Sequence, residues 1–175
     1  MQKRITLLTL LALFTTAALA QMGGGKPSPP ATATCDLGGG KTIKTDYSSP
    51  GMKGRKIYGG LVPFGEVWRT GANEATTFVT SADVEVGGKT VPAGNYTIFT
   101  VPAAGKWTLI INKTTGEWGI PYKYESTELG RVDMNVSKLD APVENLTIAY
   151  DKSRSGCVLR IDWETTRAAV NISAK

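Results

Sequence analysis

The chain has 175 residues, with 20 Lys and Arg against 15 Asp and Glu, a formal net charge of +5, two cysteines and no histidine. A chain of this length is typical of one domain. The lack of histidine excludes the Ser-His-Asp triad, the Cys-His pair, and zinc or non-haem iron sites built on imidazole. We expect no cofactor and no required metal, because the aspartates are dispersed and show no calcium-loop spacing.

Residues 1–20 have the layout of a secretory signal peptide. Lys3 and Arg4 precede an apolar run over residues 5–14, and the small-residue motif that ends at Ala20 is typical of a cleavage site. The apolar run is shorter than the ~20 residues that cross a bilayer. We therefore predict an exported protein, periplasmic or extracellular, with no membrane span once the signal peptide is removed.

The positive charge of the chain does not indicate a nucleic-acid partner. Removing residues 1–20 takes away Lys3 and Arg4 and leaves 18 Lys and Arg against 15 Asp and Glu, a formal net charge of +3. These cations are scattered along the chain, whereas nucleic-acid binding requires Lys and Arg clustered on one face. We expect no nucleic-acid partner, and the sequence leaves the oligomeric state open.

Residues 21–34, with the sequence QMGGGKPSPPATAT, predict a flexible Gly- and Pro-rich leader, because these residue types have little to bury. A single β-sandwich domain over residues 35–175 is expected to follow. Val, Ile and Thr are abundant there, which is the β-branched bias of strands. No stretch of this region carries the sustained apolar stripe of an amphipathic helix, so we expect few helices, all of them short.

Short segments with strand-like alternation are separated by turn residues. They cover residues 41–47, 75–81, 83–86, 89–91, 95–101, 106–112, 131–138, 144–151, 157–163 and 168–172. Gly87-Gly88 joins two of them as a two-residue hairpin, since glycine accepts the positive φ angles of a primed turn. Several short strands without intervening helices predict an all-β fold, an antiparallel β-sandwich of Greek-key or jelly-roll topology.

Two of these segments are apolar at nearly every position. Residues 95–101 and 107–111 present apolar or β-branched side chains to both sides of a strand. Such strands are typical of sheets that are packed on both faces. We therefore place both segments in the middle of the sheet.

Cys35 and Cys157 are the only cysteines of the chain. In an exported protein, an even number of cysteines indicates disulfides, and here only one pairing is possible. A metal-binding or reactive thiol is the weaker interpretation, because there is no CxxC spacing and no histidine partner. We predict a Cys35–Cys157 disulfide that attaches the start of the domain to a late strand.

Residues 47–77 do not alternate like a strand and are rich in glycine, aromatic and charged residues. Long irregular connections on a sheet scaffold are where binding groups concentrate. The alternative is a purely structural role, in which Phe64 and Trp68 plug one end of the sandwich, Arg69 bonds backbone carbonyls and Asn73 caps a turn.

The leading hypothesis is a ligand site on residues 54–76. Trp68 and Arg69 place a stacking surface beside a planar five-donor fork, which suits a carboxylate, a phosphate or a sugar acid. Arg55 would add a second fork, and the same segment supplies the polar groups of Asn73 and Glu74. We predict a non-catalytic module of the cell envelope that binds a small anionic or carbohydrate ligand through these five residues.

Two other function classes stay open. A glycosidase-like hydrolase needs only two carboxylates and no histidine. Glu66 and Glu74 are its candidate catalytic residues, with Glu117 as a third possibility. The other class is a structural domain for protein contacts, which an exposed aromatic patch around Phe64 and Trp68 without a pocket would favour. We lean against an enzyme, because nothing in the sequence sets the separation of the glutamates.

Four blocks of sequence carry a resemblance to a known family. They are residues 54–59 (GRKIYG), 61–65 (LVPFG), 68–76 (WRTGANEAT) and 92–99 (PAGNYTIF). Together with the Trp118-Gly119 pair and Tyr124, these blocks resemble the bacterial secreted family known as domain of unknown function 2911, over roughly residues 41–165. The resemblance implies an exported bacterial protein, and it transfers no activity and no catalytic residue.

Overall fold

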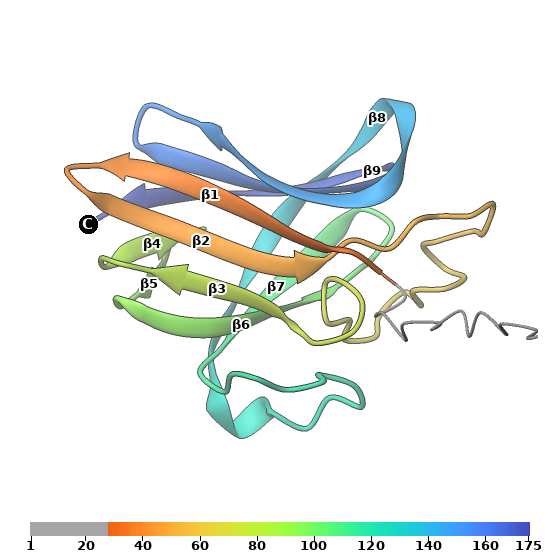
Figure 1. The fold of residues 1–175 in the computed structure, drawn as a ribbon, viewed down its shortest axis with the longest axis horizontal. Helices are drawn as coiled ribbons and strands as arrows, with labels where there is room; N and C mark the ends of the chain where they lie inside the picture. The colour runs from red at the N-terminus through yellow and green to blue at the C-terminus, as the bar shows by residue number, and fades with distance from the viewer. Residues whose placement is uncertain (1–27) are drawn as a thin grey trace, which may run out of the picture.

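The computed structural model describes residues 28–175, and the expected signal peptide over residues 1–20 lies outside the described residues. The described part is built mainly of strands, with one short 3-10 helix. In chain order the elements are β1 (Pro30–Gly38), β2 (Lys41–Ser48), β3 (Thr76–Thr80), β4 (Val84–Val86), β5 (Lys89–Val91), β6 (Gly94–Val101), β7 (Lys106–Asn112), η1 (Glu125–Thr127), β8 (Glu128–Lys152) and β9 (Gly156–Ala174). The strands pair antiparallel throughout, which confirms the predicted fold class (Figure 1).

The strands form one sheet that curls over on itself without closing into a barrel. Their order in the sheet is β1-β2-β3-β6-β7-β8-β9-β4-β5. β3 and β4 stand far apart in this order, yet only residues 81–83 connect them. A connection of this length reaches at most about 14 Å, whereas the strands between them would span about 24 Å in a flat sheet. The sheet therefore curls strongly and brings two layers face to face.

The two longest strands pass from one layer to the other. The first part of β8 pairs with β7, and its second part forms a hairpin with the first part of β9 that lies over β1 (Figure 1). The register of this pair shifts around Val143, and Glu164 opposite has a φ of 55°. Such bulges bend a strand and change which residues face inward. This is why the alternation predicted two segments, 131–138 and 144–151, where the structure has one bent strand.

The expected leader over residues 21–34 is wrong for its last part, because β1 begins at Pro30. Its pairing with β2 starts with Pro30 opposite Ser48. Ala33 and Cys35 are buried, so the Ala-Thr alternation that suggested a linker is the inward and outward alternation of an edge strand. Proline is accepted at the first position of an edge strand, because no backbone N–H is needed there for a hydrogen bond to the neighbouring strand.

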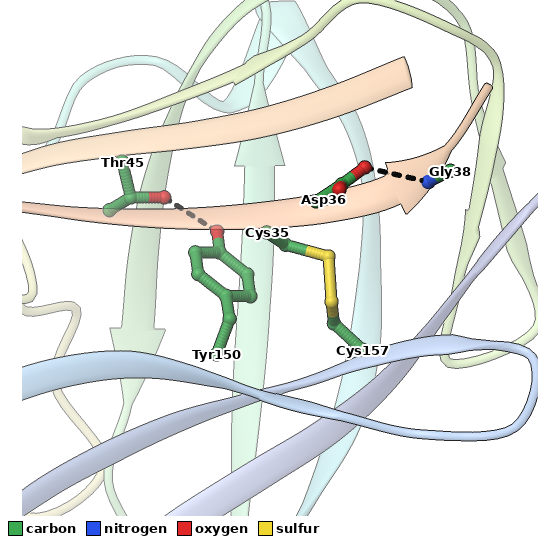
Figure 2. Close-up of a disulfide and its surroundings, with 6 residues drawn as sticks. All are labelled: Cys35, Asp36, Gly38, Thr45, Tyr150 and Cys157. Atoms are coloured by element: carbon green, nitrogen blue, oxygen red, sulfur yellow. Dashed lines mark hydrogen bonds between the residues drawn. A yellow bond between two sulfur atoms is a disulfide. The ribbon is translucent and has the colours of Figure 1, made fainter. Parts of the chain in front are cut away.

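The predicted disulfide is present and joins the two layers. Cys35 of β1 and Cys157 of β9 are bonded, with their Cα atoms 6.4 Å apart. Next to it, Thr45 Oγ1 and the Tyr150 hydroxyl lie 2.6 Å apart in a hydrogen bond that links β2 to β8 (Figure 2). The β1–β2 hairpin is therefore attached to the β8–β9 hairpin both covalently and by hydrogen bonding.

A hydrophobic core with side chains from all nine strands fills the space between the layers. A second, smaller cluster lies on the other face of β6 and β7. It contains Ala75, Phe99 and Ile110, and it is covered by Tyr122 and Tyr124 of the connection between β7 and η1. β6 and β7 are thus packed on both faces, as their apolar sequences predicted.

The predicted hairpin at Gly87-Gly88 is confirmed. Val86 pairs with Lys89, and the two glycines between them have φ angles of 54° and 87°. A β-carbon on Gly87 would also lie 2.9 Å from Val170 Cγ2. The turn therefore requires glycine there for conformation and for space.

Candidate functional site

The connection between β2 and β3, residues 49–75, lies beyond the ends of these strands at one end of the molecule (Figure 1). Its irregular backbone agrees with the prediction for this part of the sequence. Trp68 exchanges both of its backbone hydrogen bonds with Thr100 of β6, and the Met52 nitrogen donates to the Glu144 carbonyl of β8. These bonds fix the connection to both layers, so its side chains are held in defined positions.

A cavity of about 340 Å³ opens at this end, and we refer to it as the end cavity. Its lining combines cationic and apolar side chains. The cationic residues are Lys53, Arg55 and Arg69, and the large apolar ones are Leu61, Val62, Trp68, Ile120 and Trp163. Ser28, Pro50, Gly51, Gly71 and Ala72 complete the described lining. Within residues 28–175 no Asp or Glu lines the end cavity, so its lining is positively charged.

Arg69 is the best-placed cation of the end cavity. Its guanidinium carbon lies 5.0 Å from the centre of the Trp118 ring, and its Nη1 donates to the Trp118 carbonyl oxygen at 3.4 Å. Its Nε is buried and has no hydrogen-bond partner among the described residues. Burial lowers the pKa of Arg69, while the nearby Glu74 carboxylate acts in the opposite direction. Arginine still keeps its charge, and an unused donor on a charged group suits an anionic ligand.

Arg55 lines the same cavity, and part of its guanidinium group donates hydrogen bonds to backbone carbonyls. Its Nε and Nη2 donate to the carbonyl oxygens of Met52 and Gly51 at 3.0 and 2.7 Å. The same turn is anchored by the Lys53 nitrogen, which donates to Glu144 Oε1 at 2.9 Å. An arginine has five N–H donors, so Arg55 retains donors for a ligand. Of the predicted site residues, the two cations Arg55 and Arg69 both line the end cavity.

Trp68 lines the floor of the end cavity, but most of its surface belongs to the core. The side chain is only 7% exposed, and its indole nitrogen donates to the Gly71 carbonyl at 3.1 Å. Its ring is stacked on Trp163 at 5.9 Å and meets Tyr58 and Trp107 edge-on. The packing of these rings builds a rigid apolar floor, which agrees with the structural role of Trp68 at one end of the sandwich.

Asn73 and Glu74 do not line the end cavity. Asn73 is buried with a φ of 58°, and its side-chain nitrogen donates to Ser28 O and Ser48 Oγ. It therefore holds the start of the described chain against the end of β2. Glu74 lines a separate depression beside Tyr47, and it acts on the end cavity through its charge near Arg69.

The other candidate carboxylates are also outside the end cavity. Glu66 is exposed on the connection. Glu117 accepts a hydrogen bond from Thr97 at 3.3 Å through Oε2, while its Oε1 is buried without a partner among the described residues. Neither of these residues lines the end cavity, and Glu74 does not line it either. The structure therefore does not bring the proposed carboxylate pair to the opening where a substrate would enter.

The connection between β7 and η1 supplies another part of the lining through Ile120. Gly119 has a φ of 88°, and a β-carbon there would lie 2.9 Å from Ala75 Cβ and 3.2 Å from Arg69 Cβ. Glycine thus allows this connection to approach the backbone that carries Arg69. Trp118 and Ile120, on either side of it, then reach the Arg69 guanidinium and the cavity mouth.

Sequence reasoning missed several residues of the site. Lys53 was one of the scattered cations that indicated no particular partner, and Leu61, Ile120 and Trp163 gave no polar signal. Trp118 belonged to the family-like pattern but was not assigned to the site. Its stacking on Arg69 depends on two connections that are distant in sequence, and no local pattern reveals such a contact.

Comparison with known proteins places the chain in a family. A family model described as a protein of unknown function (DUF2911) matches residues 28–172. The chain belongs to this family. The family resemblance found in the sequence is thereby confirmed, and the match extends over β1 and nearly all of β9. No curated protein and no solved structure is significantly similar to the chain.

Two further findings concern membranes and metals. None of the helices within residues 28–175 is long and apolar enough to cross a bilayer. In the same part of the chain, no group of three or more potential metal-ligating side chains lies together.

Proposed function

We propose that this chain is an exported binding module whose end cavity takes a small organic anion without acting on it chemically. The observation that carries the proposal is the lining of the cavity. It combines Lys53, Arg55 and Arg69 with no carboxylate among its described residues, and Arg69 holds an unused, buried Nε donor. Charge-assisted hydrogen bonds from guanidinium groups bind anions strongly where the site is partly shielded from water.

The composition of the lining supports binding over catalysis. Ser28 carries the only hydroxyl group among the described lining residues, and there is no histidine in the chain to activate it. Paired carboxylates that flank a substrate would be required for a glycosidase. Glu66, Glu74 and Glu117 all lie outside the lining.

The disulfide supports the export part of the proposal. Cys35 and Cys157 are joined, and disulfides persist mainly in oxidising compartments such as the periplasm and the extracellular space. This agrees with the secretory pattern of residues 1–20. N-terminal sequencing of the exported protein should find Gln21 as the first residue, and an intact Met1 would contradict export by cleavage.

A thermal-shift screen tests the binding function. Protein produced from the full sequence is heated with carboxylates, sugar acids and phosphosugars, and a ligand at a hundred times its Kd adds about 2.7 kcal/mol of stability. The variant is Arg69→Gln. Arg154→Gln, an exposed arginine in the turn between β8 and β9, is the matched control.

The proposal predicts a shift for at least one anion that Arg69→Gln abolishes and Arg154→Gln retains. No shift across the panel would contradict it and favour a structural role in protein contacts. Arg69→Gln should melt close to the unaltered protein when no anion is added. A large loss of stability in that variant alone would show that Arg69 serves the fold.

A further inference from the structure

The charged groups of the end cavity are all donors, since Lys53, Arg55 and Arg69 donate only. Among the described lining side chains, the Ser28 hydroxyl alone can accept a hydrogen bond. Several backbone carbonyls of the lining already accept a hydrogen bond within the protein. They are Gly51 O from Arg55, Gly71 O from the Trp68 indole, Pro50 O from Leu146 N, Val62 O from Gly59 N, Trp68 O from Thr100 N and Arg69 O from Thr76 N. A sugar hydroxyl needs both a donor and an acceptor partner, whereas a carboxylate needs donors alone.

The remaining surface of the cavity is apolar and open to water at its mouth. Leu61 is 47% exposed and Ile120 is 44% exposed, and both line the end cavity. They belong to two different connections, so two distant parts of the chain contribute apolar side chains to the cavity. Behind them lies the floor of stacked Trp68 and Trp163 rings. Large apolar side chains exposed around an opening indicate a binding surface, because covering them removes apolar area from water.

From these two observations we propose that the ligand is an amphiphilic carboxylate, an aromatic or branched aliphatic group that carries one carboxylate, and not a sugar acid. The carboxylate accepts from the guanidinium groups of Arg69 and Arg55, and the apolar group contacts Leu61 and Ile120 over the tryptophan floor. The volume of about 340 Å³ is at the small end of ligand pockets, so the ligand is a small molecule. This inference rests on the proposed function and specifies its ligand.

Three probes separate charge from apolarity. Phenylacetate has both features, phenylacetamide keeps the ring but lacks the charge, and glucuronate keeps the carboxylate on a polar ring. Their Kd values are measured by isothermal titration calorimetry with protein produced from the full sequence. We expect phenylacetate to bind at least about tenfold more tightly than phenylacetamide, because one charge-assisted hydrogen bond is worth that factor or more. We also expect it to bind more tightly than glucuronate, because the polar ring of glucuronate has less apolar area to bury against the cavity walls.

Two variants assign the two parts of the ligand to the two parts of the cavity. Arg69→Gln should weaken phenylacetate about 10- to 100-fold and leave phenylacetamide unchanged. Leu61→Ser should weaken phenylacetate about three- to tenfold and leave glucuronate unchanged. Phe64→Ser is the matched control for the apolar change, because Phe64 is similarly exposed on the same connection but does not line the end cavity.

The outcomes distinguish this inference from the proposed function. Binding of phenylacetate that depends on both Arg69 and Leu61 supports both. Binding of glucuronate in preference to phenylacetate, still dependent on Arg69, overturns the amphiphilic ligand and leaves the anion-binding function standing. Equal losses in Leu61→Ser and Phe64→Ser also overturn it, since the apolar wall would then have no specific role. If none of the three probes binds, the inference is wrong. The proposed function then stands only if another anion gives an Arg69-dependent shift in the thermal-shift screen.

Discussion

The Arg69 guanidinium carbon lies 5.0 Å from the centre of the Trp118 ring, so a cation from the β2–β3 connection is covered by an indole from the β7–η1 connection. This contact joins two segments that no strand pairing links directly. It also orients Arg69, whose Nη1 donates to the Trp118 carbonyl while its Nε is left without a partner. The site therefore depends on how the two connections meet.

Two tryptophans of the site should respond differently to truncation. Trp68→Ala should cost about 3–5 kcal/mol of the free energy of unfolding, because a buried ring in the aromatic cluster is lost. Trp118→Ala should cost about 0.5–1 kcal/mol, the value of an exposed cation–π contact. Urea unfolding followed by circular dichroism measures both. Equal losses would mean that Trp118 has a role in the core that its 56% exposure does not indicate.

The disulfide should be a major source of stability. Cys35 and Cys157 close a loop with a sequence separation of 122, for which loop-closure entropy gives about 4–5 kcal/mol. The variant with both Cys35→Ala and Cys157→Ala should unfold at much lower urea concentration. The unaltered protein should show the same loss when a reducing agent is added, and the double variant should not respond to that agent. A reductant-insensitive midpoint in the unaltered protein would contradict a stabilising disulfide.

Glu128 should make the stability depend on pH in the acid range. Arg131 donates to both carboxylate oxygens of Glu128, at 2.8 and 2.7 Å, and these bonds lower the pKa of Glu128 below its ordinary value of 4.5. A lowered pKa adds stability at pH above the unfolded-state value, and this contribution is lost as the pH falls through the folded-state value.

Glu128→Gln should therefore be less stable than the unaltered protein at neutral pH, and the two should converge as the pH falls well below 4.5. Urea unfolding over a series of pH values checks this. The control is Glu66→Gln, which removes an exposed carboxylate on the β2–β3 connection and should change the free energy of unfolding little. A stability difference for Glu128→Gln that is constant with pH would contradict the assignment.

Glu74 should weaken the binding of anions although it does not line the end cavity. Its carboxylate acts electrostatically on Arg69 and offsets part of the positive charge that a ligand meets. Glu74→Gln should therefore tighten phenylacetate binding about two- to fivefold at low salt, with a smaller effect at high salt. Calorimetric titration at two salt concentrations measures this change. Weaker binding in the variant would show that Glu74 positions the site.

Much of the fold could be predicted from sequence because its signals are local. Gly87-Gly88 specifies its hairpin through the positive φ angles that glycine accepts, and the continuous apolarity of β6 and β7 follows from burial on both faces. β1 was not predicted, because small residues such as Ala33 give little apolar signal. The strand is held by its pairing with β2 and by the Cys35 disulfide, and neither contact is visible in the local sequence. The bends in β8 and β9 were also missed, because bulges interrupt the period that defines a strand.

The candidate site could be predicted only in part. Arg55 and Arg69 were found because guanidinium groups beside glycine and aromatic residues indicate anion binding, and both do line the end cavity. Asn73 was predicted as a site residue because its amide is a polar group that could bind a ligand. In the structure this amide is buried and donates to Ser28 O and Ser48 Oγ instead. Ile120 belongs to a connection far along the chain. Its place in the same cavity lining as Leu61 depends on the tertiary fold and not on any sequence pattern.

The most direct test of the account is the NMR signal of the Arg69 Nε–H group during a titration with phenylacetate. This donor belongs to the guanidinium that lines the end cavity and has no partner among the described residues, so an anion that binds to this guanidinium should change its surroundings. The account predicts a saturable change in its chemical shift, absent with phenylacetamide and assigned by its loss in Arg69→Gln. A signal that stays unchanged up to saturating phenylacetate would contradict the account.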